Sequence, residues 1–185
     1  NCLRFQVMKN LNLETFELSQ NYTLFYDKLE KANYFLESIL ETLDEPIGGR
    51  LIAHLLTAPL NDGGQWDMMA NLTQKYGVVP KSAMPETVSS SKTMEMNNTL
   101  TEKLREDACI LRRMHSKGSS ETELRQAKEA MLKTIYNALC ICLGVPPKTV
   151  DLQVRDKDDQ FICDLGLTPK QFYEKYVRIS LNDYV

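Results

Sequence analysis

Residues 93–144 carry two consecutive runs of apolar residues at helical spacing, separated by Gly118. Apolar residues that recur every three or four positions form one face of a helix, which has to be buried. Ser120 and Glu123 have the spacing of a capping box that starts the second helix, and Pro146-Pro147 prevents its continuation. The pattern predicts a long antiparallel helical hairpin. Its predicted apolar faces are Leu100, Leu104, Ala108, Leu111 and His115, then Leu124, Ala127, Met131, Ile135, Ala138 and Cys142.

A long helix is also predicted before this hairpin. Ser19 precedes a run of aromatic and aliphatic residues at helical spacing, and its hydroxyl can cap the first turn. The polar side of this helix is predicted to include Lys28, and the pattern breaks at Pro46 and Gly48.

Two shorter helices should follow, over residues 50–58 and 66–76. Gly77 stands at the position where a left-handed residue commonly ends a helix. Residues 81–92 are polar and contain a serine run, which predicts a connector.

The pattern changes after residue 147. Residues 150–155 alternate between apolar and polar, residues 156–159 form an acidic turn, and alternation resumes at Phe161, as in a β-hairpin. Thr168-Pro169-Lys170-Gln171 then has the residues of a capped helix start. The predicted fold class is α+β and mostly helical, with a helical hairpin and a β-hairpin.

Composition narrows the class of protein. Of the 185 residues, 43% are hydrophobic and 25% are charged, as in ordinary globular proteins. The net charge of -3 gives no basic field that would attract nucleic acid. No apolar run reaches the ~18 residues of a membrane span, and no signal-peptide pattern opens the chain. We therefore expect a cytoplasmic protein with no membrane or nucleic-acid partner.

The start of the chain predicts that it is an internal piece of a longer protein. Its first residue is Asn1, and Leu3, Val7 and Leu11 already have helical spacing with no cap before them.

The residues that could carry chemistry are few. The odd number of cysteines, five, with Cys140 and Cys142 on one predicted helix, predicts neither disulfides nor a zinc site. His54 and His115 are predicted to be surface or core-edge residues, and neither forms a catalytic pair with a cysteine. The acidic turn lacks the glycine and the closing glutamate of a calcium loop. These residues predict no catalytic group, metal or cofactor within the chain.

One loop, Asn61-Asp62-Gly63-Gly64-Gln65-Trp66, has an unusual composition. Two glycines leave room for another backbone to approach, and the only tryptophan follows as an apolar wall. Two interpretations stay open. The loop is an ordinary entry into the next helix, or it is a ledge on which a peptide substrate pairs with exposed backbone.

Several segments, in order along nearly the whole chain, resemble the bleomycin hydrolase and aminopeptidase C family of papain-like cysteine peptidases. The likeness is stronger to the bacterial members. The matching segments are Phe16-Glu17-Leu18-Ser19-Gln20, Phe25-Tyr26-Asp27-Lys28-Leu29-Glu30-Lys31-Ala32-Asn33-Tyr34-Phe35, Asp62-Gly63-Gly64-Gln65-Trp66-Asp67-Met68, Lys75-Tyr76-Gly77-Val78-Val79-Pro80-Lys81, Cys142-Leu143-Gly144-Val145-Pro146-Pro147, Arg155-Asp156-Lys157-Asp158 and Leu167-Thr168-Pro169-Lys170-Gln171-Phe172-Tyr173.

The resemblance implies an aminopeptidase that removes residues from peptide N-termini and assembles as a homohexamer. It implies three parts. Residues 1–92 would belong to the helical half of a papain-like core with the substrate ledge, residues 93–147 to a helical-hairpin insertion, and residues 148–185 to the β-hairpin and a helix. The chain alone is expected to be inactive, because the family's catalytic Cys would precede Asn1, and its His and Asn would follow Val185.

The resemblance also implies roles for individual residues. Gly64 would present its backbone to the substrate, and Gly63, Gln65, Trp66 and Met68 would shape the adjoining specificity pocket. By the same comparison, the cysteine at position 2 and both histidines match no catalytic position.

Two other interpretations compete with this one. The chain is an autonomous helical assembly module without catalytic activity, whose large apolar faces drive self-association. Alternatively, it is a helical domain whose family match arises by chance, for which the ordered matches leave little room.

Overall fold

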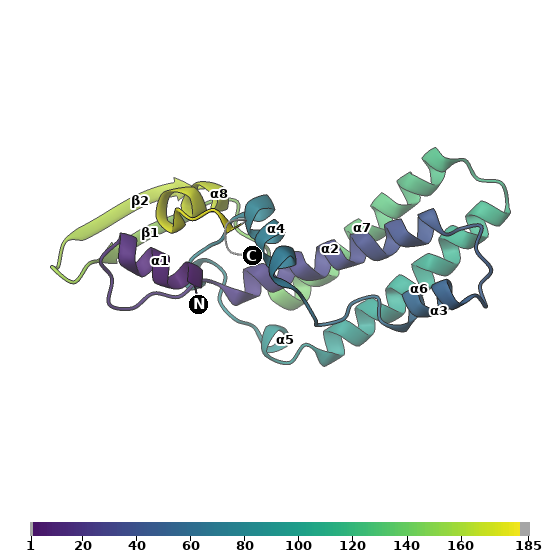
Figure 1. Ribbon diagram of the computed structural model, residues 1–185, viewed down its shortest axis with the longest axis horizontal. Helices are drawn as coiled ribbons and strands as arrows, with labels where there is room; N and C mark the ends of the chain where they lie inside the picture. Colours follow the sequence, from purple (N-terminus) through teal and green to yellow (C-terminus); the bar gives the residue numbers. More distant parts are fainter. Residues whose placement is uncertain (1, 182–185) are drawn as a thin grey trace. The chain divides into compact units, whose positions relative to one another are not determined.

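In the computed structural model, which describes residues 2–181, most of the chain is helical and the strands form one two-stranded antiparallel sheet (Figure 1). This confirms the predicted fold class. The chain forms two compact units. Unit 1 comprises Asn1–Tyr26, Gly63–Thr87 and Gly144–Val185, and unit 2 comprises Asp27–Asp62 and Val88–Leu143. The three-part division proposed from the resemblance stays a prediction.

The first helices of unit 1 follow from local sequence. α1 spans Cys2–Asn10, and α2 spans Gln20–Glu41, which runs on from unit 1 into unit 2. Ser19 is the N-cap of α2, as predicted. Its Oγ accepts a hydrogen bond from the Tyr22 amide at 3.0 Å and thereby pairs one of the amides that a helix start leaves without a partner.

α4 spans Trp66–Tyr76, which are the predicted bounds, and Gly77 ends it with a φ of +75°. The predicted connector is less irregular than its polar sequence indicated. It contains a 3-10 turn, η1, over Lys81–Ala83 and a short helix, α5, over Val88–Ser91.

The predicted β-hairpin is present in unit 1. β1 (Val150–Arg155) pairs with β2 (Phe161–Leu167) in antiparallel register. The turn between them is closed by Asp156, whose Oδ1 accepts hydrogen bonds from the amides of Asp158 at 2.9 Å and Gln160 at 2.8 Å. The carboxylate therefore stabilises the turn together with its backbone hydrogen bonds, from the Asp156 amide to the Gln160 carbonyl at 3.0 Å and from the Asp159 amide to the Asp156 carbonyl at 3.1 Å.

The helix after the hairpin begins as predicted. α8 spans Pro169–Phe172 and continues as the π-turn η2 over Tyr173–Val177. Thr168 Oγ1 accepts from the Gln171 amide at 3.2 Å, and Gln171 Oε1 accepts from the Thr168 amide at 2.9 Å, which completes the capping box. Buried apolar side chains from these elements form the core of unit 1, including Leu3, Val7, Leu11, Val150, Leu152, Phe172, Tyr176 and Val177.

Unit 2 contains the predicted helical hairpin, formed by α6 (Met94–Ser116) and α7 (Glu121–Leu143), with α3 (Arg50–Thr57) and the rest of α2 (Figure 1). Gly118, with a φ of +83°, lies in the turn between α6 and α7. The predicted capping box closes there too, since the Ser120 amide donates to the Glu123 carboxylate at 2.7 Å.

The predicted apolar face is correct for most of the hairpin and wrong at the end of α7. Leu139 and Leu143 are buried there, whereas Ala138 and Cys142 are only half-buried. The last turns of α7 are apolar on several sides, so spacing alone did not define which side is buried. His115 is also only half-buried, because its ring turns toward the carboxylate of Asp44.

A second correction concerns Lys28, which was predicted on the polar side of α2. This residue belongs to unit 2, and its side chain is completely buried. It lies one turn after Phe25 and one turn before Ala32, both of which are buried. The apolar stripe therefore includes this position, and the charge needs a partner.

No helix among residues 2–181 is both long enough and apolar enough to cross a membrane.

Candidate functional site

The predicted ledge lies at the entry to α4, within unit 1. Gly63 and Gly64 are exposed, and Gln65 is the N-cap of the helix with an extended backbone, φ −108° and ψ 168°. A Cβ atom built on either glycine would meet no atom within 4 Å. Neither glycine has a positive φ. Packing among the described residues and local backbone conformation therefore leave both positions open to a side chain.

The first turn of α4 supplies the apolar part of the same segment. Trp66 and Met68 are 36% and 37% exposed. Trp66 Nε1 donates to the carbonyl of Leu181 at 3.3 Å, which ties one edge of the indole to the end of the described chain. A tryptophan held by its N–H while part of its ring faces solvent suits the wall of a pocket.

These five residues (Gly63, Gly64, Gln65, Trp66 and Met68) are called the ledge below. They lie together because they are adjacent in sequence, and all five are exposed or at the edge of exposure. The arrangement offers backbone groups and an apolar wall but no nucleophile, acid or base. Its use by a substrate stays a prediction.

The cysteines and histidines lie apart from the ledge in sequence. Cys2 is exposed on α1, and His54 is exposed on α3. His115 Nε2 lies 2.9 Å from an oxygen of Asp44, and the two polar side chains form a solvent-accessible pair. Among residues 2–181 no three His, Cys, Asp or Glu side chains are grouped so that they could hold a metal ion.

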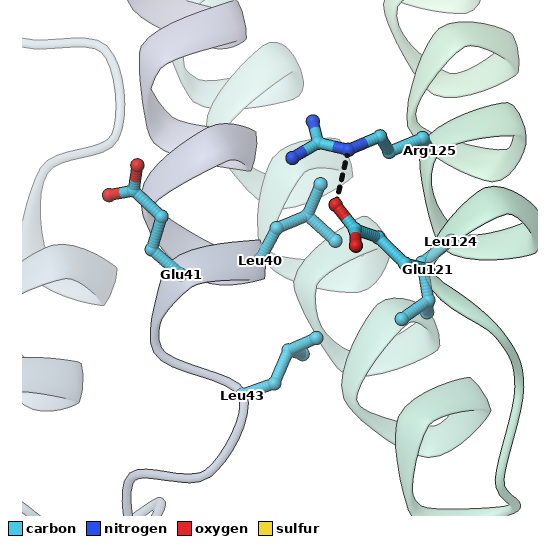
Figure 2. Close-up of a pocket in the computed structure, with 6 residues that line it drawn as sticks. All are labelled: Leu40, Glu41, Leu43, Glu121, Leu124 and Arg125. Atoms are coloured by element: carbon cyan, nitrogen blue, oxygen red, sulfur yellow. Dashed lines mark hydrogen bonds and ion pairs between the residues drawn. The ribbon is translucent and has the colours of Figure 1, made fainter.

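A cavity of about 250 Å³ lies in unit 2, near the end of α2 and the start of α7 (Figure 2). Leucine side chains and charged groups line it together. Arg125 Nε donates to Glu121 at 2.9 Å, and its Nη1 donates to Glu37 at 3.0 Å. Arg125 thus offsets charge from two neighbouring carboxylates. The lining residues are Leu40, Glu41, Leu43, Glu121, Leu124 and Arg125.

Sequence reasoning missed the partners of Asp62, the last residue of unit 2 before the ledge. Asp62, which precedes Gly63, receives hydrogen bonds from the buried Lys28 and from Asn97 of α6. The signal for Lys28 was its position in the apolar stripe of α2. Asn97 carried no signal, because nothing in the residues around it indicates that it would face Asp62.

The model of the Peptidase C1-like family matches residues 1–185. The chain is 51% identical over 185 residues to Aminopeptidase C of Listeria monocytogenes. The match covers 100% of this chain and 41% of that protein. It is 42% identical over 184 residues to Bleomycin hydrolase of Rattus norvegicus, and that match covers 98% of this chain and 40% of that protein.

A solved structure agrees with these relatives. The crystal structure of pepW from Lactobacillus rhamnosis HN001 superposes with a TM-score of 0.95 at 47% identity. The superposition covers 98% of this chain and 41% of the pepW chain. The chain therefore spans about two fifths of the length of the proteins it matches.

Proposed function

Because this chain belongs to the Peptidase C1-like family, we propose that it is part of a cysteine aminopeptidase that hydrolyses N-terminal residues from peptides. One observation carries the proposal. The similarity to proteins named Aminopeptidase C runs through all 185 residues at 51% identity, and the chain spans 41% of their length. The thiolate and imidazole of such an enzyme would come from residues outside this chain.

The contribution of this chain would be to bind the substrate. An extended peptide can form short antiparallel hydrogen bonds with the backbone of Gly64, while its side chain packs beside Trp66 and Met68. The open space over Gly63 and Gly64 supports this role, since a peptide backbone needs that space. Gln65, exposed between them, would contribute to the same pocket.

A Gly64→Ala variant of the full-length protein tests this role. The added methyl group meets nothing in the described chain, so folding should be unaffected, but it would lie where the substrate backbone approaches. Losing about one to two hydrogen bonds should raise KM roughly tenfold with the melting temperature unchanged.

Gly48→Ala is the matched control, because its added Cβ also meets no atom within 4 Å, and it lies in unit 2. It should leave both KM and stability unchanged. If Gly64→Ala leaves KM unchanged as well, the ledge does not bind the substrate backbone.

We further propose that the chain alone is inactive. Cys2 is exposed on α1 and would be the first cysteine suspected of acting as a nucleophile. The isolated chain should release no fluorophore from an aminoacyl reporter, and a Cys2→Ala variant should behave identically. Thiol-dependent hydrolysis by the isolated chain would show that the catalytic roles are assigned wrongly.

The full-length protein would be a cytoplasmic homohexamer, in keeping with the family resemblance, and sedimentation measures its assembly. A role as an assembly module without catalysis is the second candidate. Exposed apolar side chains in unit 2, such as Ile47, Val88 and Ile141, favour it. A monodisperse monomer of the isolated chain would count against this second role.

A further inference from the structure

The tryptophan of the ledge is held by a stretch of backbone that has no regular structure. Trp66 Nε1 donates to the carbonyl of Leu181 at 3.3 Å, and both residues belong to unit 1. Residues 178–180, which lead to Leu181, lie in neither a helix nor a strand. The orientation of the indole therefore depends on what fixes residues 178–181.

Tyr173 provides a second side-chain hydrogen bond to the same stretch. Its hydroxyl donates to the carbonyl of Ile179 at 2.6 Å, again within unit 1. Burial raises the pKa of this hydroxyl above its ordinary value of 10.0, so the group keeps its proton and remains a donor near neutral pH. A carbonyl outside helices and strands needs a donor from elsewhere, and tyrosine supplies it here.

The turn that begins this stretch has an uncommon backbone conformation. Arg178 follows η2 with φ +57° and ψ +34°, in the left-handed region that residues other than glycine seldom adopt. Its Nε donates to the Lys175 carbonyl at 2.6 Å, and its amide donates to the Tyr173 carbonyl at 3.3 Å. Such a conformation persists where neighbouring contacts hold it. These bonds fix the direction in which the chain leaves η2.

The same part of the chain also contacts the other end of α4. The Val78 amide, just after the helix, donates to the Pro169 carbonyl at 3.3 Å. α4 and α8 lie beside each other in unit 1 (Figure 1). Because α8 runs directly into η2, one continuous stretch, residues 169–181, is bonded to both ends of the helix that carries Trp66.

We propose that Tyr173 is a positioning residue of the ledge. Through the Ile179 carbonyl it fixes residues 178–181, and the Leu181 carbonyl then orients the Trp66 indole as a wall of the specificity pocket. This inference rests on the proposed function of the ledge and deepens it. Selectivity for a large apolar side chain of the substrate would depend on a hydroxyl group that is bonded to backbone.

The test uses Tyr173→Phe in the full-length protein, which removes the hydroxyl and keeps the ring. Amide hydrogen exchange over residues 178–181 should rise about tenfold, because the stretch loses one of its hydrogen bonds. The second measurement is the ratio of kcat/KM for a leucyl reporter to that for an alanyl reporter. This ratio should fall roughly fivefold, because a displaced indole no longer packs against the larger side chain.

The matched control is Tyr22→Phe. The Tyr22 hydroxyl also donates to a backbone carbonyl of unit 1, that of Tyr76, at 2.8 Å. Its loss removes a hydrogen bond of the same chemical kind without touching residues 178–181. Exchange over that stretch and the leucyl-to-alanyl ratio should therefore stay at the wild-type values.

Trp66→Phe distinguishes positioning from a general loss of stability. Phenylalanine keeps an aromatic ring but has no N–H to donate to Leu181. The variant should lower the leucyl-to-alanyl ratio by itself. If Tyr173 acts through Trp66, adding Tyr173→Phe to Trp66→Phe should lower the ratio no further, whereas two independent effects would multiply.

The inference is overturned if exchange over residues 178–181 in Tyr173→Phe matches that in Tyr22→Phe, or if Tyr173→Phe leaves the ratio unchanged. It is also overturned if the two effects multiply in the double variant, or if Trp66→Ala lowers the ratio and Trp66→Phe does not. If Trp66→Ala itself leaves the ratio unchanged, the proposed function of Trp66 in the ledge fails first, and the positioning role of Tyr173 falls with it.

Discussion

Replacing Gly77 with alanine should be among the most damaging single-methyl changes in unit 1. Gly77 ends α4 with φ +75° and ψ −161°, and its amide donates to the Thr73 carbonyl at 2.7 Å. A Cβ atom at this position would lie 2.3 Å from the carbonyl carbon and oxygen of Pro169, and 2.5 Å from the amide nitrogen of Lys170. These are backbone atoms, so no change of side-chain rotamer can make room.

Two effects determine how much Gly77→Ala lowers the free energy of unfolding. The backbone conformation is one that only glycine adopts readily, which costs about 1–3 kcal/mol for alanine. Relieving the clash means moving the start of α8 away, which breaks the hydrogen bond from the Val78 amide to the Pro169 carbonyl, now 3.3 Å long. It also disturbs Phe172, which is fully buried in α8. We expect a loss of about 4 kcal/mol in the free energy of unfolding, a large part of the ~5–15 kcal/mol typical of a domain.

The assay is equilibrium unfolding in urea, monitored by circular dichroism, with Gly166→Ala as the control. Gly166 lies in the same unit and also has a positive φ, +69°, but its added Cβ would meet no atom within 4 Å. It should show only the conformational cost, about 1 kcal/mol. If Gly77→Ala costs no more than Gly166→Ala, the close approach between Gly77 and Pro169 is absent and the reasoning is refuted.

Three further predictions concern stability. Hydrogen bonds from Lys128 and Arg125 hold the pKa of Glu37 below its ordinary 4.5, so its stabilisation is present above that pH and lost as the pH falls through the folded-state pKa. Glu37→Gln should therefore shrink the difference in unfolding free energy between neutral and acidic pH. Burial raises the pKa of Asp107 above 3.8, so its contribution has the opposite sign and stability declines as the pH rises from there. Asp107→Asn should remove that decline in the same pH series. Thr168→Ala should lose the capping box of α8 and about 1 kcal/mol in urea unfolding, and Thr168→Ser should retain most of it.

The features that sequence predicted well are local ones. Ser19, Ser120 and Thr168 each cap a helix where expected, and Gly77 ends α4 at its expected residue. Each of these depends on a few neighbouring residues, whose side chains and backbone conformations decide the outcome. The same is true of the β-hairpin, which alternation and an acidic turn were enough to predict.

The features that sequence predicted badly depend on contacts between distant segments. Lys28 and Asp62 are far apart along the chain, so no pattern around either one announces their ion pair. The last turns of α7 are apolar on several sides, and only packing selects Leu139 and Leu143 for burial over Ala138. The hydrogen bond between Trp66 and the Leu181 carbonyl is likewise invisible before folding.

The glycines of this chain separate into two kinds, and the difference bears on function. Gly77 is required by the fold itself, through a positive φ and a backbone in close contact. Gly63 and Gly64 have neither constraint, so the fold of the described residues would accept alanine at both. Glycine at these two positions costs conformational entropy on folding, and nothing that an added Cβ would meet in the described residues requires it there. In the ledge hypothesis, a substrate backbone occupies the space beside these glycines. The hypothesis therefore predicts that Gly64→Ala leaves the free energy of unfolding unchanged and raises KM.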